Sequence, residues 1–244
     1  MHENAFLAAL MRETTLPLRW VTLERGQTLF ASDAHVTEVY FPIDAVVALV
    51  VPLMSGPCVE TAMIGRDGAV GANEAANDLP AASTAVVRVS GKAIACSNVA
   101  LAKAAREQPG VSMLIARQGG SLLASAHQTA ACVSAHLLAP RFATWLLHVR
   151  LLAGRDMIDI TQEEIAELLG VRRTSVSVIA HDLRQRGAIS HSRGRVKIGD
   201  VAALASCACE CHRAFFKGSS EARSTRTVVH PFSASEAFVK APPA

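Results

Sequence analysis

Residues 17–96 alternate short apolar runs with turn-forming residues, a pattern typical of a domain built from β-strands. The runs are rich in Val and Thr, and Gly, Pro, Asn and Asp separate them. Such spacing predicts an all-β sandwich or barrel. The segments are WVTLERGQTLF, VTEVYFP, AVVALVV, CVETAMIG and AVVRVSGKAIAC.

After residue 97 the apolar positions recur at helical spacing. The pattern predicts helices over 97–109, 110–137 and 140–154. Pro109 ends the first helix, and Pro140 suits the first turn of the last one. One seam of the long helix carries mostly small side chains, against which another helix could pack: Ile115, Leu122, Ala126, Thr129 and Val133.

A pair of helices joined by a tight turn is predicted within residues 156–198. Thr161 and Glu164 have the spacing of a capping box, so a helix is expected to begin there. Gly170 ends that helix and allows a tight turn. A second helix follows, from about Arg173 to Arg186, with apolar positions at i, i+3, i+4 and i+7: Val176, Ile179, Ala180 and Leu183.

Positive charge is concentrated in and after the second helix. Residues 171–197 carry a net charge of +6, whereas the whole chain carries +3. The stretches AISHS and RVKI alternate around Arg193-Gly194 and predict a hairpin. Helix, turn, helix and hairpin form the layout of a winged helix-turn-helix, and a basic patch on a neutral body indicates a polyanion partner. The polar face that would enter a DNA groove carries Thr174, Ser177, Val178, His181 and Gln185.

The remaining composition favours a cytoplasmic protein that is not an enzyme. The chain lacks a run of about 18 uncharged apolar residues, and its start does not resemble a signal peptide, so no membrane partner is expected. No Ser/His/Asp or paired-carboxylate arrangement indicates catalysis. The acidic residues of the β region are interpreted as decorating strand ends and turns: Glu24, Asp33, Glu38, Asp44, Glu60 and Asp67.

The segment ITQEEIAELLGVRRTSVSVIAHDLRQRGAI, with the SRGRVKI that follows, resembles the winged helix of the Crp/Fnr family of bacterial regulators. Upstream, VYFPIDAVVALV, VETAMIGRDGAVG and HLLAPRFATWLLHVRLLAG are similar to the family's sensor barrel and the helices behind it. The resemblance covers roughly residues 15–213 and implies an α+β chain. It implies a cyclic-nucleotide-binding-like β-roll of the jelly-roll type over 1–109, a dimerisation helix over 110–138 and a DNA-binding domain over 139–217. The low-pattern tail, 218–244, is expected to be disordered.

The family resemblance also implies a transcription regulator that binds a palindromic site in double-stranded DNA as a homodimer. RNA polymerase is a candidate partner. The implied base readers are Arg173, Thr174, Ser177 and Val178; the implied phosphate contacts are Thr161, Gln162, Arg172 and Ser175; His181, Arg184, Arg193, Arg195 and Lys197 complete the predicted DNA-binding set.

Two residues of the second helix depart from the family pattern. Members that read the best-known half-sites carry Glu at the position of Thr174 and often Arg at that of Val178. Glu accepts from cytosine and Arg donates to guanine, whereas Val178 would touch a thymine methyl group. We therefore expect a different, more A·T-rich operator.

The phosphate cassette departs as well. Cyclic-nucleotide binders use Gly-Glu and an Arg, but here Gly71 precedes Ala72 and the Arg position falls on or beside Ser83. Arg88 is poorly placed as a substitute. Without a charged partner for the cyclic phosphate, strong cAMP or cGMP binding is not expected, and the effector is not identified. The degenerate pocket would comprise Gly71, Ala72, Glu74, Ser83 and Thr84.

Near the C-terminus the motif CACECH gathers possible metal ligands: Cys207, Cys209, Cys211 and His212. The spacing is not the usual C-x-x-C, and residues two apart on a helix do not share a face. Helix packing is therefore the favoured interpretation, with no metal and no cofactor expected. A haem site using His127 and His136 would rest on family analogy alone. The alternatives left open are a small-ligand, metal or redox sensor and a protein-interaction module that uses the winged helix.

Overall fold

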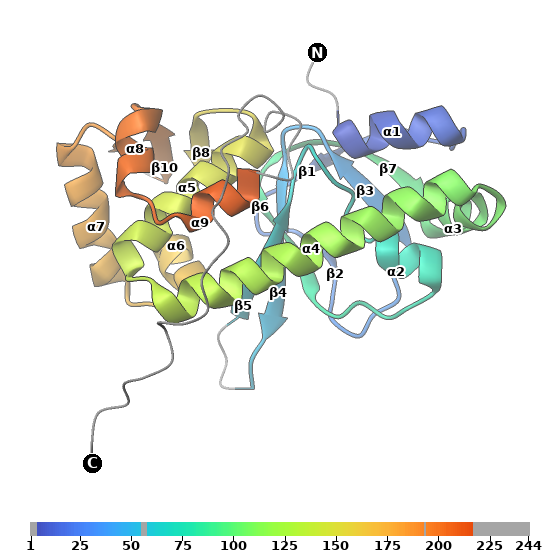
Figure 1. Ribbon diagram of the computed structural model, residues 1–244, viewed down its shortest axis with the longest axis horizontal. Helices are drawn as coiled ribbons and strands as arrows, with labels where there is room; N and C mark the ends of the chain where they lie inside the picture. The colour runs from blue at the N-terminus through green and yellow to red at the C-terminus, as the bar shows by residue number, and fades with distance from the viewer. Residues whose placement is uncertain (1–3, 55–57, 193, 217–244) are drawn as a thin grey trace, which may run out of the picture.

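The computed structural model describes residues 4–54, 58–192 and 194–216. A domain of strands and short helices lies beside the first part of the long helix α4 (Pro109–Ala135), on the right in Figure 1. A domain of helices with a small sheet lies beside the far end of α4, on the left. This arrangement confirms the predicted order of a β-roll, a long helix and a winged helix-turn-helix. The tail predicted to be disordered, 218–244, lies outside the described residues.

Two antiparallel sheets form the N-terminal domain. Their strands are β1 (Arg19–Leu23), β2 (Thr28–Phe30), β3 (Glu38–Pro42), β4 (Val46–Pro52), β5 (Cys58–Ile64), β6 (Thr84–Val89) and β7 (Gly91–Ser97). One sheet has the order β1-β7-β3 and the other the order β2-β6-β4-β5. Side chains alternate between the two faces; in β6, Ala85, Val87 and Val89 are buried and the residues between them are half-buried. Each predicted β segment overlaps at least one of these strands.

Short helices cover the N-terminal domain. They are α1 (Ala5–Glu13), α2 (Ala72–Asn77) and α3 (Asn98–Glu107). Of these, the sequence pattern predicted α3 alone. The start of α1 is anchored by the fully buried Asn4, whose Oδ1 accepts a 2.8 Å hydrogen bond from the N–H of Leu7. Its Nδ2 donates to the carbonyls of Pro42 and Gly68, at 2.8 Å each, so one side chain ties the helix to the roll.

The long helix α4 (Pro109–Ala135) begins at a proline. Proline lacks a backbone N–H, and this costs nothing at the first position of a helix, where an N–H would have no partner within the helix. The seam predicted to receive another helix is partly used within the chain, because Ile115 and Leu122 pack into cores of the N-terminal domain. Among the described residues, no helix combines the length and the apolar character needed to cross a membrane. The outer face of α4 carries a line of exposed residues spaced three or four apart: Met113, Ala116, Gly120, Leu123, His127, Ala130 and Ser134.

The C-terminal part of the chain folds as a winged helix-turn-helix. Its elements are α5 (Leu138–Ala153), β8 (Met157–Asp159), α6 (Gln162–Leu169), α7 (Arg173–Gln185), β9 (Ile189–Ser192), β10 (Arg195–Ile198), α8 (Val201–Cys207) and α9 (Cys211–Phe216). The predicted hairpin is β9–β10, and β10 also pairs with β8, a strand that the sequence pattern did not reveal. The prediction of a helix through CACECH is wrong, because α8 ends at Cys207 and α9 begins at Cys211.

One hydrophobic core runs through both domains by way of α5. Phe142 of α5 is fully buried in a cluster that includes Val46 of β4 and Val176 of α7. At the end of β5, a Cβ on Gly65 would lie 2.6 Å from the Cβ of Leu152, so glycine is needed for this close approach. The winged helix is therefore packed directly onto the four-stranded sheet.

The face of the four-stranded sheet toward α5 holds a buried acid. Glu60 lies within β5, its Oε1 accepts a 2.8 Å hydrogen bond from Trp145 Nε1, and its Oε2 lies 3.9 Å from Arg88 Nε. The expectation that Glu60 decorates a strand end is therefore wrong. Glu60 and Trp145 border a cavity of about 330 Å³ between β5 and helices α4, α5 and α6.

Candidate nucleic-acid interface

Helix α6 begins with the predicted capping box. Thr161 Oγ1 accepts a hydrogen bond from the N–H of Glu164 at 3.2 Å, and Glu164 Oε2 accepts one from the N–H of Thr161 at 2.7 Å. Two backbone donors at the helix start are thereby satisfied. Gly170 ends the helix with a φ of +67°, a conformation that favours glycine, and this turn directs the chain into α7.

Replacing Thr161 with alanine is expected to lower the free energy of unfolding by about 1 kcal/mol, because the N–H of Glu164 loses its acceptor. Urea denaturation followed by circular dichroism measures the loss. Thr174→Ala is the matched control, since Thr174 is exposed on α7 and should leave stability unchanged. An equal loss in the two variants would contradict the capping role.

Helix α7 has an apolar back and a polar front. Val176, Ala180 and Leu183 are buried against the domain, and Val178 on the opposite side is 69% exposed. Because the apolar positions recur at helical spacing, burying them turns the remaining positions outward. As predicted, the exposed front consists of Thr174, Val178, His181 and Gln185.

Contacts between α6 and α7 bring several predicted DNA-binding residues together. Ser177 Oγ donates a 2.6 Å hydrogen bond to Gln162 Oε1. Arg173 Nε lies 3.5 Å from Glu163 Oε2, an acid that the sequence analysis did not include in the site. Both side chains of this pair are mostly exposed, and such pairs contribute between about 0 and 1 kcal/mol. Arg173 can therefore exchange the carboxylate for a phosphate or a base edge at little cost.

The start of α7 places two further predicted contacts. Arg172 is the N-cap residue and is exposed. Ser175 is half-buried, and its N–H donates to the carbonyl of Arg172 at 3.0 Å. The free N–H groups and the dipole at a helix start favour a bound anion. Arg172 and Arg173 therefore add positive charge at a helix start whose backbone already favours an anion.

The wing presents cations on one face. Arg195 and Lys197 are exposed, and they alternate with the buried Val196 and Ile198 in β10. Arg195 Nε lies 2.9 Å from Asp159 Oδ1 of β8, a partner that became visible only with the pairing of β8 and β10. This ion pair holds the guanidinium on the outer side of the small sheet.

The wing tip lies beside the start of α6. A Cβ on Gly194 would lie 3.8 Å from Thr161 Cγ2. Arg193, predicted to contact phosphate, lies outside the described residues. At the other end of α7, the exposed Arg184 has its Nη2 2.9 Å from Nδ1 of His181. The described members of the predicted set therefore lie on α7, at the start of α6 and on the wing.

The predicted cyclic-nucleotide pocket is divided between two elements. Gly71, with a φ of +83°, is the N-cap of α2, which contains Ala72 and Glu74. A Cβ on Gly71 would lie 2.8 Å from Val36 Cγ1, so the backbone here is already closely packed. This packing explains why position 71 is a glycine, without any role for a ligand.

The second part of that pocket lies at the start of β6. Thr84 Oγ1 accepts a 3.0 Å hydrogen bond from the N–H of Ser32, and Ser83 precedes it at the strand entrance. Arg88 points to the face of β6 opposite Ala85 and Val87, toward Glu60. Arg88 therefore cannot take the place of a phosphate-binding arginine inside the roll.

Residues 140–207 match the model of the Crp-like helix-turn-helix domain. No curated protein matches the chain.

Solved structures share the fold over most of the chain. FixK2 from Bradyrhizobium japonicum has a TM-score of 0.66 at 18% identity, covering 80% of this chain and 98% of its own. A CRP-family transcriptional regulator from Thermus thermophilus has a TM-score of 0.59 at 25% identity, covering 78% of this chain and 99% of its own. A putative regulator of the crp/fnr family from Eubacterium rectale has a TM-score of 0.61 at 14% identity, covering 86% of this chain and 95% of its own.

Proposed function

We propose that this chain, a member of the Crp/Fnr family of transcription regulators by its fold and its Crp-like helix-turn-helix, binds a palindromic operator in double-stranded DNA as a homodimer. The observation that carries the proposal is the exposed front of α7, which is flanked by Arg172 and Arg173 at its start. A helix with a buried apolar back and a free polar front fits the major groove. The cations of the wing, Arg195 and Lys197, would hold the flanking phosphates.

The exposed line on α4 supports pairing of two copies. Its positions alternate by three and four residues, which is the spacing of a coiled-coil seam. Small residues such as Ala116, Gly120 and Ala130 would let two helices approach closely. Leu123, which is 58% exposed in the single chain, would be buried in such a pair. A two-fold pair of winged helices would read a site with two-fold symmetry.

Two residues on the front of α7 support a distinct operator. Thr174 and Val178 are both exposed, at positions where the family members that read the best-known half-sites carry Glu and often Arg. Val178 offers an apolar surface to a thymine methyl group, and it has no donor for guanine. We therefore propose an operator richer in A·T pairs than the catabolite activator's own half-site. We further propose that the β-roll does not bind cAMP strongly, since Ala72 and Ser83 supply no charge.

Selection of bound duplexes from a random pool, with the native protein and with Arg173→Ala, tests this function. The native protein is expected to enrich a two-fold symmetric site. The variant is expected to bind that site more weakly by about 1 to 3 kcal/mol. It is also expected to lose preference at one position of each half-site, because Arg173 begins α7 beside the side that would face the groove. Arg106→Ala, which removes an exposed arginine of α3, is the matched control and should bind like the native protein.

The salt dependence of binding separates this function from a protein-interaction module. Replacement of counterions by arginines gives a steep fall of log K with log salt concentration. Failure of the native protein to bind any duplex at low ionic strength would overturn the proposal. A selection that returns the catabolite activator's half-site would overturn only the operator assignment.

A further inference from the structure

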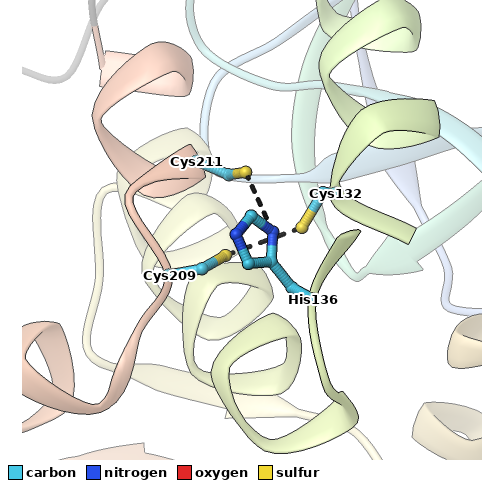
Figure 2. A group of neighbouring side chains, drawn as sticks. All are labelled: Cys132, His136, Cys209 and Cys211. Carbon is cyan, nitrogen blue, oxygen red and sulfur yellow. Dashed lines mark hydrogen bonds between the residues drawn. The ribbon is translucent and has the colours of Figure 1, made fainter. Parts of the chain in front are cut away.

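Three thiols and one imidazole meet where the end of α4 contacts the start of α9. Cys132 and His136 come from α4 and its C-cap, and Cys209 and Cys211 come from the α8–α9 turn and the start of α9 (Figure 2). Their four ligand atoms lie within 4.8 Å of one another. The three cysteines are between 3% and 7% exposed. The cluster therefore has the composition and the enclosure of a metal-binding site.

Local structure explains how the side chains converge. Cys132 and His136 are four residues apart, so they lie on the same side of the helix end. Cys209 lies in the turn between α8 and α9, and Cys211 is the first residue of α9, so the change of direction in the chain here brings both thiols toward the end of α4. Because Cys209 precedes the helix that Cys211 begins, the two cysteines do not lie on one continuous helix, and the helical spacing does not separate them. Cys207 belongs to α8 and is not part of the cluster.

Two distances between the ligand atoms fit a tetrahedral ion and exclude a disulfide. Two sulfurs bound to zinc at about 2.3 Å lie about 3.8 Å apart, and a bound sulfur and nitrogen lie about 3.6 Å apart. Here Sγ of Cys132 is 3.6 Å from Sγ of Cys209, and Sγ of Cys211 is 3.5 Å from Nδ1 of His136. A disulfide would require about 2.05 Å between sulfurs. The cluster thus leaves room for an ion between its ligand atoms.

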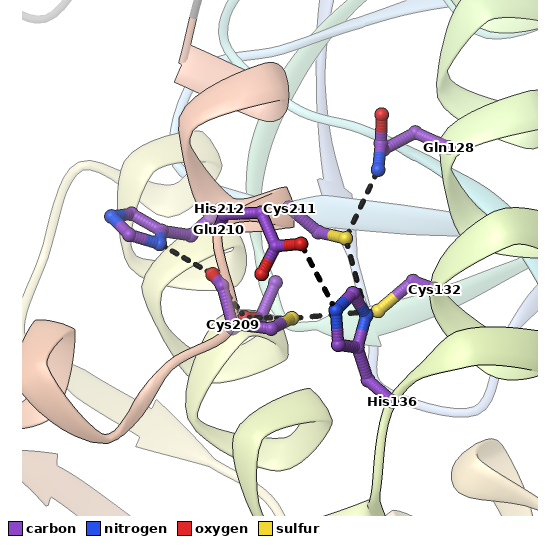
Figure 3. Close-up of polar contacts among 8 residues, drawn as sticks. Gln128, Cys132, His136, Cys209, Glu210, Cys211 and His212 are labelled. Atoms are coloured by element: carbon purple, nitrogen blue, oxygen red, sulfur yellow. Dashed lines mark hydrogen bonds and ion pairs between the residues drawn. The ribbon is translucent and has the colours of Figure 1, made fainter. Parts of the chain in front are cut away.

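The surrounding polar groups orient the ligands (Figure 3). Nε2 of His136 lies 3.2 Å from Oε1 of Glu210, which leaves Nδ1 facing the thiols. A carboxylate behind a ligating histidine is the usual support of such sites. Gln128 Nε2 donates to Sγ of Cys211 at 3.0 Å, and Thr144 Oγ1 lies 3.0 Å from Sγ of Cys209. Such donors offset the negative charge of bound thiolates.

We propose that Cys132, His136, Cys209 and Cys211 bind one Zn²⁺ ion in a closed tetrahedral site. The soft thiolate ligands and the single imidazole suit this ion, and four protein ligands leave no position for substrate. On binding, the three thiols release their protons to solvent, so three thiolates and Zn²⁺ leave one net negative charge. The site is structural rather than catalytic.

The ion would join two parts of the molecule that are far apart in sequence. Phe215 of α9 already stacks on His148 of α5, with ring centroids 4.3 Å apart. A zinc ion between α4 and α9 would add a fixed link from the long helix to the same α9. The orientation of the DNA-binding domain on the long helix would then depend on metal occupancy.

Metal analysis of the full-length protein tests the site. The chain is purified with reductant, loaded with Zn²⁺, freed of unbound ion, and analysed by plasma mass spectrometry. We expect about one zinc ion per chain in the native protein. Cys209→Ser is expected to lose the ion, and Cys207→Ser, the matched control from the same motif, is expected to keep it. Glu210→Gln should keep the ion but bind it about 10- to 100-fold more weakly in competition with a chelator.

Cobalt substitution keeps the proposal testable if a cysteine variant does not fold. Co²⁺ added to the native apoprotein should give the strong visible bands of a tetrahedral ion and thiolate charge-transfer absorption, and Zn²⁺ should abolish both. A folded native protein that retains neither ion overturns the proposal, and so does a Cys209→Ser variant that retains zinc. A Cys132–Cys209 disulfide in freshly purified protein, or iron with sulfide in place of zinc, also overturns it.

Discussion

Replacing Phe142 with alanine is expected to lower the free energy of unfolding by about 3 to 5 kcal/mol. Phe142 is fully buried, and its core includes residues of both β4 and α7. Truncation removes a whole aromatic ring where the sheet and the winged helix meet, and neither side can move without disturbing the other. The cavity left behind adds to the lost transfer free energy. Urea denaturation followed by circular dichroism measures the effect.

Leu137→Ala provides the control for this prediction. Leu137 lies five residues earlier, at the N-cap of α5, and is 82% exposed. Removing its side chain should change stability by less than about 0.5 kcal/mol. A loss below about 1 kcal/mol in Phe142→Ala would show that the shared core closes around the gap or does not exist as described.

Replacing Glu60 with glutamine is expected to make the protein increasingly more stable than the wild type as the pH rises. Burial raises the pKa of Glu60 from 4.5 to about 7, and the hydrogen bond from Trp145 and the charge of Arg88 only partly oppose this shift. The proton on Glu60 thus stabilises the fold fully below about pH 4.5, and this contribution is lost as the pH rises through about 7. Glutamine keeps an oxygen to accept from Trp145 and never ionises.

The size of the effect follows from the shift in the pKa of Glu60. Between about pH 4 and about pH 8, the stability difference between Glu60→Gln and the wild type should grow by about 3 kcal/mol in favour of the variant. His148 changes stability in the opposite sense, because burial lowers its pKa to about 4 and its contribution is lost as the pH falls through that value. Because both proteins contain His148, its contribution cancels when their stabilities are compared at the same pH.

Denaturant titrations at several pH values measure the difference. A constant difference across the whole range would mean that folding leaves the pKa of Glu60 unchanged, and would contradict the prediction. Wild-type and variant Trp145 fluorescence should agree at low pH, since the hydrogen bond to residue 60 persists in both proteins.

The elements that sequence predicted well are those whose periodicity is uninterrupted over two turns or several strand residues. Helix α7 is such a case, because its apolar positions at 176, 179, 180 and 183 define one buried face and thereby the exposed front. The capping box at Thr161 and the glycine at 170 are local signals, and both work as predicted. Local chemistry thus determined most of the described surface that we propose to bind DNA.

The features that sequence did not predict depend on contacts between distant segments. Strand β8 has three residues, too few for a period, and it forms because β10 offers it a partner. Glu60 resembles a surface acid until Trp145, 85 residues later, covers it. Cys132 and Cys209 are 77 residues apart, and nothing in either local pattern indicates the other. Long-range packing, rather than propensity, determines these features.

The interior shared by β4, α5 and α7 has a consequence for how the protein melts. Two domains with separate interiors can lose order at different temperatures, but here one domain cannot open without wetting the other's apolar side chains. We expect heating to give a single calorimetric peak. A fragment starting at residue 139 would expose the sheet-facing side of α5 to water and would be prone to aggregate.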